Sequence, residues 1–326
     1  AASFTQKLFR MYAEDFERFG YQPRVPSLPM IPRSVFPPGF WCVVTRCRRE
    51  PALAEFCSYY LAEGADHVFV IWDTRVGDSN PMEGLPSPLP DRVTVLTDVD
   101  TTQKQTVRYV YQNFLRQRFT WVSHLDVDEF VVPVREPGST IRETLMAVFD
   151  RSGCDQVHVP WVMMSCNGRK EETATPLQDL TWRWDHDRRH VGSTPRSRKF
   201  RCRFDEIETK TFVRCAAYGT LACDHFAGSP VYPGSPSVVD SVSGKAHTTG
   251  TMFHQLREHD IRSAHMVCYH FRLQSLAACK RKMGDSNFYS QGRETEADMM
   301  STDFSEIEDA TLRVRRLAQL GIERTN

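Results

Sequence analysis

Several common sequence signals are missing from this chain of 326 residues. It has no run of about 18 apolar residues, so no transmembrane helix is predicted within it. Its ten cysteines form no Cys-x-x-Cys pair, which excludes the spacing of a zinc ribbon. It has no Asn-x-Ser/Thr acceptor, which disfavours a glycosylated lumenal protein. The 41 acidic and 41 basic residues cancel, which argues against nucleic-acid binding through bulk charge.

The cellular compartment is left open by the cysteines and by the start of the chain. Cys42 and Cys268 lie in apolar runs, where buried free thiols are common, whereas disulfides between other cysteines are not excluded. The chain starts at Ala1 without Met and shows no signal peptide, so a membrane anchor could lie outside the printed sequence. Both a Golgi-lumenal domain that has lost its anchor and a cytoplasmic protein fit these observations.

The first 135 residues alternate predicted strands and helices in the order β-α-β-β-α-β. These elements are expected at 40–45, 51–64, 67–72, 92–96, 103–118 and 121–132. The alternation is typical of an α/β fold with a mostly parallel sheet flanked by helices. Ligands of such sheets bind outside the carboxyl ends of the strands. We therefore expect Asp73, Asp126 and Asp128 to line one crevice.

The segment from Trp121 to Val132 places three carboxylates between two apolar runs. A carboxylate beside a buried strand is costly unless a cation or a hydrogen-bond donor compensates it. As one continuous strand, the segment would have Asp126 and Asp128 on one face and Glu129 on the other. Two oxygen ligands on one face suit Mg²⁺ or Mn²⁺ held against a substrate's phosphates. The alternative for an isolated Asp-x-Asp is an acidic surface turn.

Basic residues gather in three stretches, although the net charge is zero. The stretches contain Arg46, Arg48 and Arg49; Arg183, Arg188, Arg189, Arg196, Arg198, Lys199, Arg201 and Arg203; and Arg272, Lys280, Arg281 and Lys282. Each stretch is either a solvated face or a set of contacts for a phosphorylated ligand.

Four blocks between residues 40 and 285 resemble one enzyme group in their order and spacing. They are Glu50, Glu55 and Gly64–Asp73; Gln105, Trp121 and Asp126–Phe130; Thr209–Cys215 with His225; and Met266–Ser275 with Lys280–Gly284. In these blocks the chain resembles glycosyltransferase family 92 and the related family-2-like domains of the GT-A fold. It departs from the family's pattern at Arg49, Phe56, Thr74 and Cys215, where the family has Asn, Trp, Asn and Pro.

The resemblance implies a GT-A (Rossmann-like) fold with a mostly parallel central sheet and a smaller acceptor-side subregion. It also implies transfer of a hexose from a nucleoside-diphosphate donor, with UDP the leading choice, to a hydroxyl of a glycan or glycoconjugate. The transfer would depend on Mn²⁺ or Mg²⁺ and would proceed with inversion. The domain would cover residues 40–285, with a donor half at 40–135 and an acceptor half at 136–285. A helix and extended arm at 1–39 would precede it, and a helical extension at 286–326 would follow.

Roles for individual residues follow from the matched blocks and, for Arg46, from the first basic stretch. The expected metal ligands are Asp126, Asp128 and His270, and the expected donor contacts are Asp73, Asp126, Arg46, Lys210, Lys280 and Lys282. The alternatives are a core histidine for His270, a turn-initiating residue for Asp73 and a surface lysine for Lys210.

An inverting transfer also needs a carboxylate base near the acceptor hydroxyl. The candidates are Asp185, Asp187, Asp205, Glu206 and Glu208, of which Asp205 and Glu206 are favoured because they precede a predicted core strand. Trp182 and Trp184 either stack on acceptor sugar rings or pack their loop.

Two other functions are compatible with clustered carboxylates and basic residues. One is a metal-assisted hydrolase or nucleotidyl transferase, although such a site would want a third or fourth carboxylate ligand. The other is a non-catalytic glycan-binding protein that keeps the fold without the chemistry.

Overall fold

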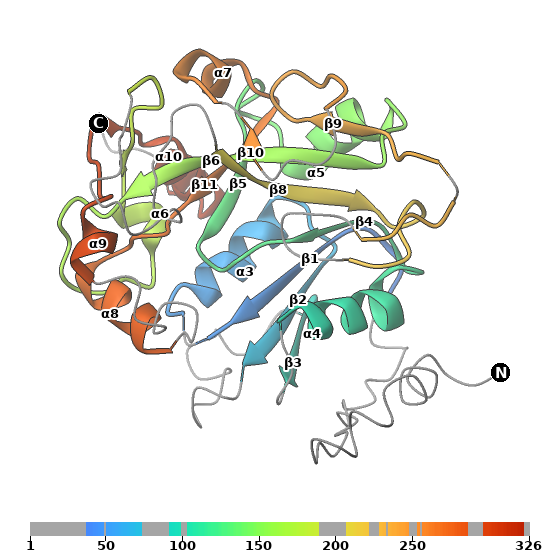
Figure 1. Cartoon of the computed structure of the whole chain (residues 1–326), viewed down its shortest axis with the longest axis horizontal. Helices are drawn as coiled ribbons and strands as arrows, with labels where there is room; N and C mark the ends of the chain where they lie inside the picture. Colours follow the sequence, from blue (N-terminus) through green and yellow to red (C-terminus); the bar gives the residue numbers. More distant parts are fainter. Residues whose placement is uncertain are drawn as a thin grey trace, which may run out of the picture.

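The computed structural model describes residues 37–48, 50–73, 91–98, 103–188, 207–221, 228–232, 234–247, 253–254, 256–285 and 296–322. Across these ranges, one mixed sheet carries helices on both faces (Figure 1). Its strands are β1 (Gly39–Cys47), β2 (His67–Asp73), β3 (Val93–Asp98), β4 (Phe119–His124), β5 (Glu129–Pro133), β6 (Gln156–Ser165), β7 (Trp182–Arg183), β8 (Ile207–Arg214), β9 (Val238–Asp240), β10 (Phe253–His254), β11 (Met266–His270) and β12 (Ile307–Glu308).

The helices cover the sheet and its edges. They are α3 (Leu53–Ala62), α4 (Gln103–Val110), α5 (Ile141–Thr144), α6 (Pro176–Asp179), α7 (Glu258–Ser263), α8 (Leu276–Asp285), α9 (Glu296–Met300) and α10 (Thr311–Gln319). Two π-helical segments, η3 (Tyr111–Leu115) and η4 (Leu145–Asp150), continue α4 and α5. A capping box starts α5, because the side chains of Thr140 and Glu143 each accept the other's backbone N–H.

The first four strands form the parallel unit that the sequence predicts. They lie side by side in the order β3-β2-β1-β4, and every neighbouring pair is parallel. Alternate residues of β1 face opposite layers of the core: Val43 packs in the cluster that contains Phe56 of α3, whereas Val44 packs in the cluster that contains Tyr111 of η3. Helices on both faces of this unit leave its strand ends as the open edge for a ligand.

The rest of the sheet is mixed, so a mostly parallel sheet is wrong beyond β4. Strand β8 lies between β4 and β6 and is antiparallel to both, which makes β6 parallel to β4. Strand β11 runs parallel to β6 and pairs antiparallel with β5. The carboxyl ends of β1, β4, β6 and β11 therefore point the same way, toward the side where α8 and α9 lie in Figure 1.

The single strand predicted for residues 121–132 is also wrong. Strand β4 ends at His124, residues 125–128 leave the strand conformation, and β5 begins at Glu129. The two halves join different partners, since β4 pairs with β1 and β8 whereas β5 pairs with β11. An apolar run interrupted by carboxylates therefore marks a change of strand partner at the edge of the sheet.

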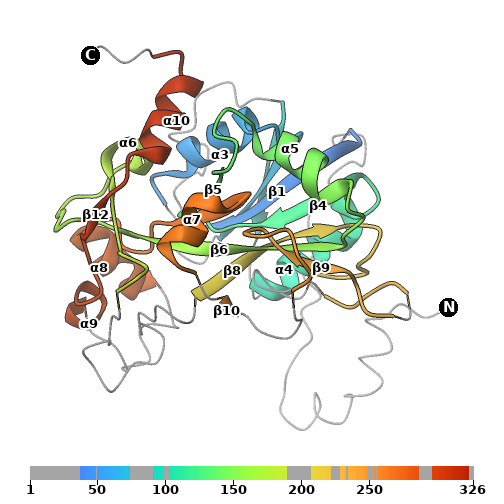
Figure 2. The ribbon, with the colours of Figure 1, turned by 90° about the horizontal axis from the view of Figure 1, so that it is seen from above.

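The end of the chain packs against the main sheet. Strand β12 pairs with β7, and α10 lies beside α6 and α3 (Figure 2). Buried Arg183 joins these parts through a bidentate ion pair with Glu258, at 2.7 and 2.8 Å, and a contact of 2.7 Å with Asp309. In the described part of the chain, no helix is long and apolar enough to cross a membrane.

The protonation of His67, which β2 holds against β3, should make the stability of the protein depend on pH. Its Nε2 atom lies 2.9 Å from Thr94 Oγ1, and burial, with the charge of Arg92, lowers its pKa from 6.5 to about 4. Between those pH values the unfolded chain binds a proton that the folded protein excludes, so stability present above pH 6.5 is lost as the pH falls. At pH 4 the loss should be about 3 kcal/mol.

Urea unfolding at several pH values checks this expectation in His67→Gln, which should lose less stability on acidification than the parent protein. His259→Gln is the matched control, because 74% of that side chain is exposed, and its profile should follow the parent's. Equal slopes for His67→Gln and the parent would contradict the assignment.

Candidate active site

The acidic turn between β4 and β5 is fixed to two neighbouring strands by backbone hydrogen bonds. The Leu125 N–H donates to Val44 O of β1 at 3.0 Å, and the Phe271 N–H donates to Asp128 O at 2.8 Å. Glu129 closes the turn, because its Oε2 accepts the Asp126 N–H at 2.8 Å. The turn therefore lies between the carboxyl ends of β1 and β11.

Asp126 and Glu129 share one ammonium group. Lys210 of β8, whose side chain has no exposed surface, places Nζ 2.9 Å from Asp126 Oδ2 and 3.0 Å from Glu129 Oε2. The expectation that Glu129 points away from Asp126 is thus wrong, because both converge on Lys210. Fully buried, Lys210 orients the turn in this structure and is not open to a donor.

Asp128 lies beside His270 and Lys282. His270 Nε2 is 3.8 Å from Asp128 Oδ1, and Lys282 of α8 forms an ion pair with Asp128 Oδ2. The Lys282 ammonium also donates to Arg272 O at 3.1 Å. Two of the predicted metal ligands and one predicted donor contact are therefore neighbours, brought together from a turn, a strand and a helix.

Burial sets the protonation of the two innermost groups. It lowers the pKa of His270 well below its ordinary value, and the charges of Lys282, Arg272 and Lys210 add to the effect. His270 is accordingly a neutral imidazole, which is the form that binds metals. Burial raises the pKa of Glu129 well above its ordinary value, although Lys210 opposes this shift.

The donor atoms fit a divalent ion only in part. Among the described residues, no group of three or more His, Cys, Asp or Glu side chains could hold a metal. His270 Nε2 and Asp128 Oδ1 do converge, at 3.8 Å. Asp126 instead points to Lys210, and Lys282 lies on Asp128. An ion here would take Asp128 and His270 from the protein and its other ligands from substrate or water.

The remaining predicted donor contacts are dispersed. Arg46 is buried at the carboxyl end of β1, the strand that holds the acidic turn. Asp73 ends β2, and its side chain lies outside the described residues. Lys280 has 60% of its side chain exposed and lies 3.9 Å from Glu296, so it does not contact the acidic turn.

The candidate bases are not resolved by the fold. Asp205 and Glu206 lie outside the described residues. Asp185 and Asp187 accept backbone N–H groups within their own loop and at the start of α7. Their roles stay predictions.

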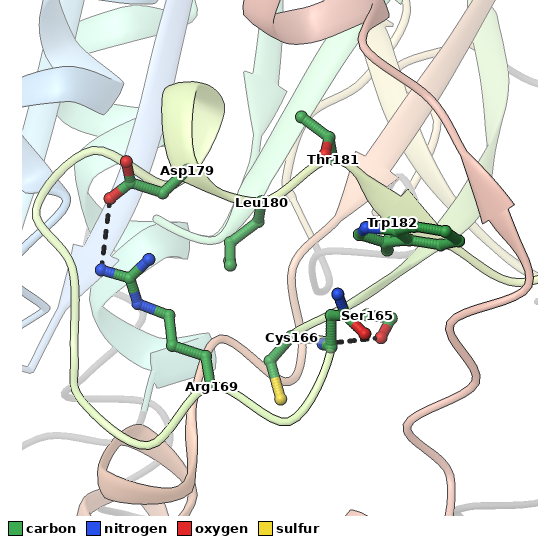
Figure 3. Close-up of a pocket in the computed structure, with 8 residues that line it drawn as sticks. Ser165, Cys166, Arg169, Asp179, Leu180, Thr181 and Trp182 are labelled. Atoms are coloured by element: carbon green, nitrogen blue, oxygen red, sulfur yellow. Dashed lines mark hydrogen bonds and ion pairs between the residues drawn. The ribbon is translucent and has the colours of Figure 1, made fainter.

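The two tryptophans of β7 and its flank have different environments. Trp184 is buried and meets Phe304 edge to face at 5.5 Å, which is the loop-packing alternative. Trp182 is half-buried and forms one wall of a pocket of about 240 Å³. Leu180 and Cys166 line that pocket, and the ion pair between Arg169 and Asp179 lies opposite the tryptophan (Figure 3).

This pocket lies on the same edge of the sheet as the acidic turn. It opens at the end of β6, and β6 pairs with β11 so that Met163 is opposite His270. Backbone hydrogen bonds from Leu276 to Arg169 O, at 2.9 Å, and from Ala277 to Lys170 O, at 3.0 Å, hold the start of α8 beside it. Helix α8 therefore connects the pocket with the site at Asp128.

One residue of this region was missed by sequence reasoning. Trp161 of β6 packs its ring 4.1 Å from that of His270, and Lys210 Nζ lies 5.8 Å above it. In sequence it is an aromatic residue within an apolar strand, as a core residue would be. No local signal distinguishes it from a core residue, because its place beside His270 depends on the pairing of β6 with β11.

Comparison with known proteins gives little further information. No protein-family model and no curated protein matches the chain. Among solved structures, HddC from Yersinia pseudotuberculosis is similar at 10% sequence identity and a TM-score of 0.35, over 69% of this chain and 97% of that one. This similarity is too low to assign a fold family or a function.

Proposed function

We propose that this protein is a glycosyltransferase that takes a sugar from a nucleoside-diphosphate donor, UDP-hexose being the leading candidate, with a divalent ion at Asp128. The observation that carries the proposal is the position of Asp128 at the carboxyl ends of the parallel strands, beside a neutral His270 and the Lys282 ammonium. In such a transfer, charge builds up on the diphosphate as the glycosidic bond breaks. A bound cation and Lys282 would stabilise that charge, and His270 and Asp128 would hold the cation.

The acceptor would approach from the side of β6 and α8. The half-buried ring of Trp182 offers a flat apolar face, and Arg169 and Asp179 offer hydrogen-bonding groups across the pocket. This combination suits a sugar ring, whose C–H face packs on an aromatic ring while its hydroxyl groups bind polar side chains. The transfer would be inverting, with Asp205 or Glu206 as the proposed base.

A thermal-shift screen tests this function directly. We expect one nucleoside diphosphate, UDP first, to raise the melting temperature in the presence of Mn²⁺ and to raise it less without the ion, because a ligand that binds only the folded protein stabilises it. At 100 times its dissociation constant the ligand should add about 2.7 kcal/mol. Adenosine diphosphate with the same ion is the matched control for the base.

Three results would oppose the proposal. No stabilisation by any nucleoside diphosphate with Mn²⁺ would remove its basis. Stabilisation by glycans alone, independent of nucleotide and metal, would indicate a binding protein. Hydrolysis of a phosphodiester without any acceptor would indicate a metal-assisted hydrolase.

A further inference from the structure

Lys282 occupies the position beside Asp128 that a divalent cation would need. Its ammonium forms an ion pair with Asp128 Oδ2, while the other oxygen of the same carboxylate faces His270 Nε2 at 3.8 Å. The pair is largely withdrawn from water, since 16% of the Lys282 side chain and 11% of the Asp128 side chain are exposed. Charges at such partly buried positions interact far more strongly than charges at the surface.

His270 completes the surroundings of Asp128, because its Nε2 lies 3.8 Å from Oδ1, too far for a hydrogen bond. The His270 side chain is more than nine-tenths buried, so the ring and the carboxylate meet largely out of contact with water. The imidazole is aimed at Asp128, but Lys282 holds the carboxylate.

Helix α8, which carries Lys282, is held at its start by backbone hydrogen bonds and near its end by the ion pair of Lys282 with Asp128. Leu276 and Ala277 are tied to the loop after β6, whereas Lys282 lies about 9 Å further along the helix axis. A lysine side chain has four rotatable carbon–carbon bonds, so the ammonium can move between nearby anions without displacing the helix. A diphosphate beside Asp128 would offer it a more highly charged partner.

We propose that Lys282 is a built-in counter-ion of Asp128, which opposes binding of a free divalent cation until a nucleoside diphosphate draws the ammonium onto its phosphates. Metal and nucleotide then bind cooperatively, because the nucleotide frees Asp128 for the ion as it takes up the lysine. The nucleotide half of this inference rests on the proposed function. The half that concerns the metal alone does not.

Mn²⁺ titrations without nucleotide test the first half, followed by calorimetry or by the electron paramagnetic resonance signal of free Mn²⁺. Lys282→Met keeps the aliphatic stem and removes the charge, so it should bind Mn²⁺ at least about ten-fold more tightly than the parent protein. Lys280→Met is the matched control on the same helix; its side chain is 60% exposed and pairs with Glu296, so its Mn²⁺ affinity should equal the parent's. Lys282→Arg, which keeps the charge, should also bind as weakly as the parent.

A second variant locates the ion. Adding Asp128→Asn to Lys282→Met should abolish the gain in affinity. If Lys282→Met binds Mn²⁺ no more tightly than the parent, or if the double variant keeps the gain, the counter-ion role is wrong. Melting temperatures of all variants show whether each is folded, and Lys282→Gln, which also removes the charge, supplies the comparison if Lys282→Met is not.

The nucleotide half is tested by titrating UDP with and without Mn²⁺. Coupling between two ligands is reciprocal, so Mn²⁺ should tighten UDP binding by the factor by which UDP tightens Mn²⁺ binding. This factor should be smaller in Lys282→Met than in the parent. An unchanged factor would overturn the proposal that Lys282 moves from Asp128 to the phosphates. Absence of UDP binding to the parent in both conditions would instead count against the proposed function, while the Mn²⁺ titrations would still decide the role of Lys282.

Discussion

Replacing Lys210 by Met is expected to destabilise the protein by about 3 kcal/mol at pH 7. Lys210 and Glu129 are both fully buried, and removing the ammonium leaves the carboxylate among apolar neighbours with Asp126 and Asp128 close by. Glu129 can then avoid the charge by taking up a proton. The cost of that proton at pH 7 sets the size of the effect, which should fall as the pH is lowered.

A double variant separates charge from packing in this prediction. Lys210→Met combined with Glu129→Gln removes both charges, and the new amide oxygen can still accept the Asp126 N–H, so most of the lost stability should return. Urea unfolding of the parent, both single variants and the double variant gives the coupling energy. Lys280→Met makes the same substitution at an exposed position and should change stability by no more than about 0.5 kcal/mol. A cost below about 1 kcal/mol for Lys210→Met, or no recovery in the double variant, would contradict the account.

The elements that sequence predicted well are those fixed by local pattern. Strands β1, β2 and β3 and helix α3 arise from apolar periodicity within their own segments. The parallel pairing of β1 with β2 follows from the same alternation, because helix α3 between them returns the chain to the same end of the sheet.

The elements that sequence predicted poorly are those fixed by partners far along the chain. Whether residues 125–128 continue β4 depends on β11, which pairs with β5 and draws the chain away from β8 after Asp128. Strands β7 and β12 have two residues each and exist because they pair with one another and with β6. No local pattern in so short a segment indicates such pairing.

The same distinction applies to the candidate site. The residue types and the edge of the sheet could be predicted, and Asp128, His270 and Lys282 do meet there. Which cation holds which carboxylate could not, because Asp126 and Asp128 are two residues apart yet take partners from β8 and α8. Lys210 illustrates the difficulty: in sequence it reads as a surface lysine or a donor contact, whereas the pairing of β8 buries it completely.

The second large effect is expected for Asp128→Asn, which should lose Mn²⁺-dependent binding of the nucleoside diphosphate and reduce turnover of the sugar donor at least about 100-fold. The amide keeps the size and one acceptor oxygen of the carboxylate but not its charge, so an ion shared with His270 would lose its anionic ligand. Asp150→Asn is the matched control. The Asp150 carboxylate accepts a hydrogen bond from Trp121 Nε1 near the start of β4, at the opposite edge of the sheet. It also forms an ion pair with Arg214 at 2.8 Å.

Donor turnover, nucleotide calorimetry and melting temperature should be measured on both variants, since the three together distinguish loss of chemistry from loss of structure. Asp128→Asn should stay folded, because the backbone bond from Phe271 to Asp128 O does not depend on the side chain. Asp150→Asn should be less stable than the parent but turn over the donor at the parent's rate once folded. Undiminished turnover in Asp128→Asn would show that the Asp128 charge is not needed for sugar transfer. An equal loss of turnover in Asp150→Asn would show that the loss comes from a general disturbance of the sheet.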